Sequence, residues 1–191
     1  MEALFTSTAV VALAEIGDKT QLLAIILAAR FKKPLAIIAG IFAATIANHF
    51  LAALVGAQVA SILDGQWLRY LVAASFVAMA AWTLIPDKLD DDPEPEPARF
   101  GAFAATTIAF FLVEMGDKTQ IATIALGARF HDVLAVTMGT TLGMMIANVP
   151  AVFLGSQLLK RVPLRIIRWI AAGLFLAIGL WVLAQTTGQF G

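Results

Sequence analysis

The sequence reads EIGDKTQ over residues 15–21 and EMGDKTQ over residues 114–120, so the two stretches differ at one position. Moving the chain along itself by the same 99 positions also superposes Arg30 on Arg129 without a gap. One offset that holds over so much of a chain indicates an internal repeat. We therefore expect the two halves to fold into similar units, each built around one copy of the motif.

The regions around the two motifs are strongly apolar. Of the 191 residues, 60% are hydrophobic and 14% are charged, whereas a soluble domain carries about 25% charged residues. Six apolar stretches are each long enough to cross a bilayer, which takes roughly 20 helical residues. They cover residues 3–29, 34–63, 67–85, 101–128, 133–159 and 164–184. The expected fold class is an all-α integral membrane protein with six transmembrane helices.

The number of spans in each half predicts how the halves are related. Residues 1–85 hold a first three-helix repeat and residues 100–191 a second one. The linker between them, at 86–99, is rich in proline and carboxylates and cannot bury apolar surface. Because three is an odd number, the second repeat enters the membrane from the opposite side and is inverted. Inverted repeats are typical of secondary transporters, whose site lies near the membrane midplane.

Basic residues near the ends of the spans predict the orientation, because Lys and Arg are retained on the cytoplasmic side of a membrane. With six crossings, one side receives Arg69 and Arg129. The other side receives Arg30, Lys32, Lys33, Lys88, Arg99, Lys160, Arg161, Arg165 and Arg168. We therefore expect the acidic linker in the cytoplasm and both termini outside the cytoplasm.

Charge balance and composition exclude several classes of protein. Thirteen basic and 13 acidic residues cancel, which leaves no basic field for nucleic acid. The chain has no cysteine, so disulfides, thiolate metal sites and iron–sulfur clusters are excluded. The spans hold a single histidine and no nucleophile–base arrangement, so we expect neither an enzyme nor a cofactor. The lipid bilayer is an expected partner, and a homo-oligomer stays open.

Four carboxylates lie near the middle of the first and fourth spans: Glu15, Asp18, Glu114 and Asp117. An ionised side chain at a helix centre costs ~2.5 to 3.5 kcal/mol against lipid, so these groups are expected to face inward. On a continuous helix, the three-residue spacing places both acids of a motif on one face. Converging carboxylates cannot all stay ionised without counter-charge. We therefore predict a site that holds either a divalent cation or protons, as a cation/proton antiporter requires.

Neighbouring polar residues extend this site. Thr20 and Thr119 offer further oxygens, and Gly17 and Gly116 are expected to let the helices open. An all-oxygen site suits calcium, magnesium or manganese. Second-tier candidates for ligation, proton relay or interhelical hydrogen bonds are Lys19, Lys118, Gln21, Gln120, Asn48, His49 and Asn148.

A structural interpretation of the motif competes with this one. Glu15 precedes Lys19 by four residues, and Glu114 precedes Lys118 by four, which is the favourable order for an ion pair within one helix. Such pairs account for two of the four acids and leave the two aspartates unpaired. We therefore favour a functional site over purely structural pairing.

Both motifs resemble the duplicated E-x-G-D-K/R-T/S signature of the GDT-type cation/proton exchanger family, also known as uncharacterised protein family 0016. The resemblance covers essentially the whole chain. It implies export of manganese, calcium or both from the cytoplasm in exchange for protons. Without an N-terminal targeting segment, the sequence is similar to short bacterial members, which implies manganese export across the bacterial inner membrane. The site residues carried over by the resemblance are Glu15, Asp18, Glu114, Asp117, Thr20 and Thr119.

A second class of function stays open, the export of small organic cations such as basic amino acids. Acidic residues in the membrane suit such a substrate as well. An amino-acid site also needs a partner for the substrate carboxylate, and Lys19 and Lys118 are the obvious candidates. The expected partner is nevertheless a divalent metal ion.

Overall fold

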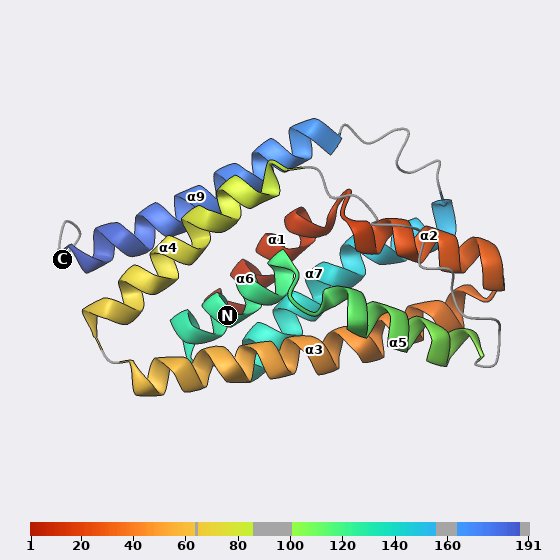
Figure 1. The fold of residues 1–191 in the computed structure, drawn as a ribbon, viewed down its shortest axis with the longest axis horizontal. Helices are drawn as coiled ribbons and strands as arrows, with labels where there is room; N and C mark the ends of the chain where they lie inside the picture. The colour runs from red at the N-terminus through yellow and green to blue at the C-terminus, as the bar shows by residue number, and fades with distance from the viewer. Residues whose placement is uncertain (64, 86–100, 156–163, 188–191) are drawn as a thin grey trace.

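The computed structural model describes residues 1–63, 65–85, 101–155 and 164–187. Within these ranges every regular element is an α-helix (Figure 1). The helices are α1 (Glu2–Glu15), α2 (Lys19–Phe31), α3 (Pro34–Ile62), α4 (Gln66–Thr83), α5 (Ala102–Glu114), α6 (Lys118–Phe130), α7 (Val133–Leu154) and α9 (Leu164–Thr186). The acidic linker expected at 86–99 lies outside the described residues, as do Lys88, Arg99, Lys160 and Arg161.

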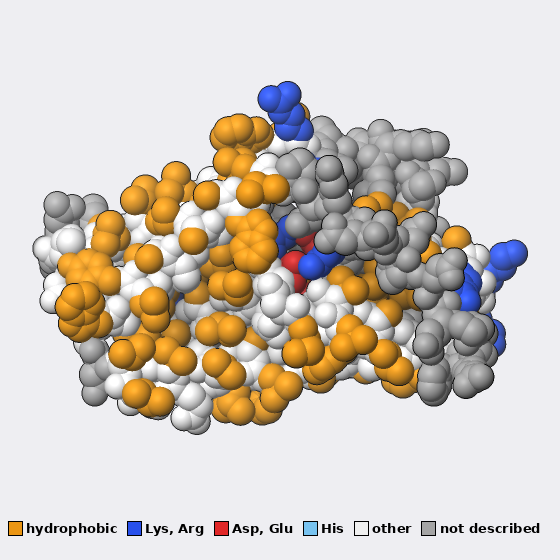
Figure 2. All heavy atoms as spheres, in the orientation of Figure 1, with side chains coloured by type: hydrophobic (Ala, Val, Ile, Leu, Met, Phe, Trp, Pro, Cys, Tyr) orange, Lys and Arg blue, Asp and Glu red, His pale blue; other side chains and the backbone are white. Residues whose placement is uncertain are grey.

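Within the described residues, three segments are long and apolar enough to cross a membrane: α3, α7 and residues Arg165–Thr186 of α9. The helix α5 is a shorter apolar helix. Large hydrophobic side chains such as Phe50, Leu71 and Leu180 are exposed, and hydrophobic atoms cover much of the face drawn in Figure 2. An apolar surface of this extent indicates contact with lipid rather than water. The all-helical fold expected from the composition is therefore confirmed for the described residues, and its apolar helices are those of a membrane protein.

The first and fourth expected spans are not continuous helices, so that expectation was wrong. The stretch at 3–29 is interrupted between α1 and α2, and the stretch at 101–128 between α5 and α6. The cause is the glycine of each motif: Gly17 has a φ of 83° and Gly116 a φ of 77°. Only glycine adopts this left-handed region readily, and the chain leaves the helical path there.

After each break, the motif itself starts the next helix. Asp18 is the N-cap of α2 and accepts a hydrogen bond from the backbone N–H of Thr20, while Asp117 caps α6 and accepts one from Thr119. An aspartate N-cap satisfies one of the free N–H groups at a helix start. Each motif therefore contains, in order along the chain, the end of one helix, a left-handed turn at glycine and the start of the next helix.

Small residues, among them Gly40 and Gly139, allow the long helices to approach their neighbours closely. A Cβ on Gly40 in α3 would lie 2.8 Å from the carbonyl oxygen of Phe103 in α5. A Cβ on Gly139 in α7 would lie 2.5 Å from the carbonyl oxygen of Leu4 in α1. Helices α3 and α7 thus contact α5 and α1 at positions that correspond between the two halves.

Helices α4 and α9 form a second layer beside the others (Figure 1). Phe76 of α4 and Phe175 of α9 are both buried, with ring centroids 6.2 Å apart. These two residues are also 99 positions apart in the sequence. This contact between the halves therefore joins corresponding residues of α4 and α9. Helices α1 and α6 lie between this pair and the long helices α3 and α7 (Figure 1).

Gly56→Ala is expected to destabilise the protein by about 1–3 kcal/mol, because overpacking a tight contact forces the backbone to move. A Cβ on Gly56 would lie 2.1 Å from the backbone oxygen of Ile124. The matched control is Gly173→Ala in α9, where no atom lies within 4 Å of the added Cβ. Thermal unfolding in detergent measures both variants, and equal melting temperatures would contradict the close approach of α3 and α6.

Candidate functional site

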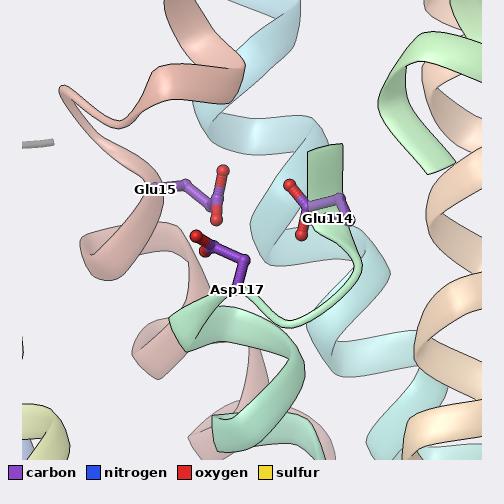
Figure 3. A group of neighbouring side chains, drawn as sticks. All are labelled: Glu15, Glu114 and Asp117. Carbon is purple, nitrogen blue, oxygen red and sulfur yellow. The ribbon is translucent and has the colours of Figure 1, made fainter. Parts of the chain in front are cut away.

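The two helix breaks bring acidic side chains together. Glu15 is the last residue of α1, Glu114 is the last residue of α5, and Asp117 is the N-cap of α6. One carboxylate oxygen from each of the three lies within 4.8 Å of the others. Figure 3 shows Glu15 and Asp117 pointing toward each other, with Glu114 beside them. All three side chains are buried, so this carboxylate cluster (Glu15, Glu114 and Asp117) concentrates negative charge away from bulk water.

The fourth predicted acid, Asp18, is also buried but lies outside the cluster. It forms an ion pair with Lys118 of the other motif. The expectation that Glu15 and Asp18 share one helix face was wrong, because α1 ends at Glu15 and Asp18 begins α2. The acids lie close together because two broken helices approach each other, not because of their spacing along one helix.

The threonines of the motifs contact the glutamates. Thr20 donates a hydrogen bond from Oγ1 to Glu15 Oε2 over 2.5 Å. Thr119 donates from Oγ1 to Glu114 Oε2 over 2.9 Å. The other oxygen of each glutamate, Oε1, is buried and has no hydrogen-bond partner among the described residues. An unsatisfied buried acceptor is destabilising, so both Oε1 atoms are suited to bind a cation or a proton.

The salt bridges of the two motif lysines in the described residues run to aspartates of the other motif, which disfavours the competing interpretation of lysine–glutamate pairs at four-residue spacing. Lys19 Nζ lies 2.8 Å from Asp117 Oδ1, and Lys118 pairs with Asp18. The four-residue rule assumes a continuous helix, and each motif is interrupted at its glycine. The ion pairs therefore run from one half of the chain to the other, which spacing within a motif does not reveal.

The glutamines of the motifs form hydrogen bonds that link each helix break to one of the long helices. Gln21 accepts a hydrogen bond from Gly17 N–H over 3.0 Å and donates one to the Ala147 carbonyl of α7 over 2.9 Å. Gln120 accepts from Gly116 N–H over 2.7 Å and donates to Asn48 of α3 over 2.6 Å. Both amides bridge a turn and a neighbouring helix, which is a supporting role.

The remaining second-tier residues differ in their surroundings. Asn48 donates to the Phe111 carbonyl over 3.2 Å and so links α3 to α5. Asn148 donates back to the Met144 carbonyl of its own helix over 3.1 Å. His49 is fully buried, and neither ring nitrogen has a hydrogen-bond partner among the described residues. The carbonyl oxygens of Ala147 and Phe111 were not anticipated, because backbone acceptors leave no signal in the sequence.

Charged side chains are visible in the middle of an otherwise apolar face. Figure 2 shows acidic and basic groups together in a hollow of that face. Lys19 has 26% of its side chain exposed, while the Lys118 side chain is 4% exposed. With all six groups ionised, four motif carboxylates and two motif lysines leave two net negative charges, which one divalent cation would balance.

The chain matches a protein-family model described as "Divalent cation/proton antiporter GDT1" twice, over residues 3–91 and 102–190. A Vibrio cholerae protein named "Putative manganese exporter" is 53% identical over 181 residues, covering 94% of this chain and 90% of that protein. A Synechocystis protein named "GDT1-like protein sll0615" is 28% identical, covering 86% of this chain and 88% of that protein. An Oryza sativa subsp. japonica protein named "GDT1-like protein 3" is also 28% identical, covering 94% and 72%. No solved structure gives a significant match.

Proposed function

Because the chain belongs to the GDT1 family of divalent cation/proton antiporters, we propose that it exports Mn²⁺ from the cytoplasm in exchange for protons. Calcium is the second ion that the site would accept. The family is one of transporters rather than of enzymes. The proposed site comprises Glu15, Asp18, Glu114 and Asp117, with hydroxyl oxygens from Thr20 and Thr119.

One observation carries this proposal: the carboxylate cluster, whose members lie within 4.8 Å of one another and are buried. Hard cations such as Mn²⁺ and Ca²⁺ prefer carboxylate and hydroxyl oxygens. The net charge of the motif side chains supports a divalent ion. The name of the relative with 53% identity supports manganese in particular.

Exchange for protons follows because the same carboxylates need to be neutralised both when the metal is bound and when it has left. Buried ionised groups without counter-charge are strongly destabilised. When the metal leaves, protons bind to the carboxylates and neutralise their charge. The metal-free, protonated site then becomes accessible from the other side of the membrane, so the protons move in the direction opposite to the metal. The organic-cation alternative requires lysines available for a substrate carboxylate. Here both lysines contact aspartates, which favours the metal.

We also propose the topology, six crossings in two inverted three-helix repeats at 1–85 and 100–191, in the bacterial inner membrane with both termini outside. Helices α1 and α2 form one interrupted crossing, and α5 and α6 form another. Such discontinuous helices are typical of secondary transporters. Correspondence at the same offset supports the repeat, since α2 and α6 both have 13 residues and are followed by the left-handed residues Lys32 and His131.

Single cysteines test the orientation cleanly, because the chain has none of its own. With Gln66→Cys, at the start of α4, we expect labelling by a membrane-impermeant maleimide added outside the inner membrane. With Lys33→Cys, between α2 and α3, labelling is expected only after the membrane is opened. The reverse pattern would overturn the proposed orientation.

Purified protein in liposomes tests the exchange itself. Under an imposed pH gradient, Mn²⁺ uptake is expected together with proton movement in the opposite direction. Because the site carries two net negative charges, we expect two protons per Mn²⁺ and therefore a rate that does not change when valinomycin and potassium set the membrane potential. Mn²⁺ flux with no proton movement would contradict the antiport mechanism, and a steep dependence on potential would contradict the charge balance.

A further inference from the structure

The two ion pairs at the site cross between the motifs in both directions. Lys19, the first residue of α2, reaches Asp117, the N-cap of α6. Lys118, the first residue of α6, reaches Asp18, the N-cap of α2. Each lysine therefore places an ammonium on an aspartate of the opposite half, in the region where the proposed function needs an ion.

Asp117 belongs to both arrangements. It is a member of the carboxylate cluster and is also the partner of Lys19. Its Oδ1 atom contacts the ammonium at 2.8 Å, while Oδ2 accepts hydrogen bonds from the backbone and the hydroxyl of Thr119, over 3.4 and 3.3 Å. Both oxygens are thus engaged. An ionised carboxylate has lone pairs left for a further ligand, but a divalent ion on Asp117 would lie beside the Lys19 ammonium, which is held there at 2.8 Å. The two positive charges repel each other, so Lys19 competes with the ion for Asp117.

The two lysines differ in their surroundings although their sequence contexts match. Lys19 has 26% of its side chain exposed, so a displaced ammonium has access to water. Lys118 is 4% exposed, so displacing it would leave a charge buried, which is unfavourable. In this conformation Lys19 can leave its aspartate at lower cost than Lys118.

We propose that Lys19 is a tethered competitor of the transported ion: its ammonium occupies Asp117 in the metal-free site, is displaced into water when the divalent cation binds, and returns to help expel the cation. Lys118 stays on Asp18 as a fixed counter-charge. This inference rests on the proposed metal transport and assigns Lys19 a role in positioning Asp117 and tuning affinity rather than in ligation. Competition from the Lys19 ammonium keeps binding of the divalent cation weak enough for the cation to be released.

Equilibrium Mn²⁺ binding to the purified full-length protein, measured with MnCl₂ alone by the loss of the free Mn²⁺ electron paramagnetic resonance signal, tests this role. Lys19→Met removes the competing charge, so we expect a Kd about tenfold lower. The same variant in liposomes is expected to have a lower KM and also a lower kcat, because release slows. Replacing a lysine with only a structural role would not lower KM and kcat together in this way.

Three further variants serve as controls. Lys19→Arg keeps the charge and is expected to stay within about twofold of wild type, as is Lys33→Met at an exposed lysine away from the site. Lys118→Met is expected to lower thermal stability without tightening binding. If Lys19→Met does not fold, Lys19→Gln is expected to show the same gain in affinity.

The outcomes separate this inference from the proposed function. Wild-type protein that binds and transports Mn²⁺, with unchanged or weaker binding in Lys19→Met or Lys19→Gln, overturns the competitor role and leaves the antiporter standing. Folded wild-type protein that neither binds nor transports a divalent cation overturns both. Tighter binding by Lys19→Met with slower turnover supports both.

Discussion

Glu114→Gln is expected to lower Mn²⁺ transport by about 100-fold, which corresponds to about 2.8 kcal/mol of lost ion binding. Glutamine keeps the size of the side chain and can still contact Thr119, but it removes one charge from the carboxylate cluster. Removing one partner from a buried charged contact costs about 2–5 kcal/mol. Under the proposed mechanism, the buried Oε1 atom, which has no partner among the described residues, would also carry a proton.

The matched control for this substitution is Glu2→Gln, which neutralises an exposed carboxylate in the first turn of α1. Transport by this variant is expected to equal that of wild type. Size-exclusion chromatography and thermal unfolding establish that Glu114→Gln is folded. Transport at the wild-type rate in folded Glu114→Gln would remove this residue from the site.

Gly116→Ala is expected to lower transport by about tenfold through backbone geometry alone. Gly116 has a φ of 77°, and no atom lies within 4 Å of an added Cβ, so the methyl group meets no steric clash with its surroundings. The cost is conformational, roughly 1–2 kcal/mol for an L-residue in the left-handed region. We expect the turn that joins Glu114 to Asp117 to rotate and relieve this strain, which changes the distances between the carboxylates of the cluster.

Gly65→Ala is the matched control, because Gly65 also has a positive φ, of 80°, and open space around its Cβ position. It lies before α4, away from the cluster. We expect both variants to lose similar stability in thermal unfolding, with transport lowered in Gly116→Ala alone. Equal transport by the two variants would show that the turn geometry at Gly116 does not matter for the site.

Sequence reasoning selected acidic residues that the structure brings together, because acidic groups inside apolar stretches are conspicuous. Glu15, Glu114 and Asp117 are buried together, and Thr20 and Thr119 contact the glutamates. These features depend on composition and on the internal repeat, which are visible without a structure.

Hydropathy did not reveal the helix breaks, because the apolar character continues on both sides of each motif. Gly17 and Gly116 suggested that the helices open, but a glycine inside an apolar span is also compatible with a continuous helix. The alternative pairing of Glu15 with Lys19 assumed such a continuous helix. Once the chain turns at Gly17, the lysine side chain leaves its own helix face and contacts Asp117. Contacts between the halves depend on how the broken helices approach, which no local pattern encodes.

The central claim is that the carboxylate cluster binds the transported ion, and anomalous diffraction from crystals grown with Mn²⁺ tests it most directly. We predict one strong manganese peak at bonding distance from carboxylate oxygens of Glu15, Glu114 and Asp117. In that state the Lys19 ammonium is expected to have moved off Asp117. A manganese peak elsewhere in the protein, with the cluster empty and the lysine in place, would contradict the account.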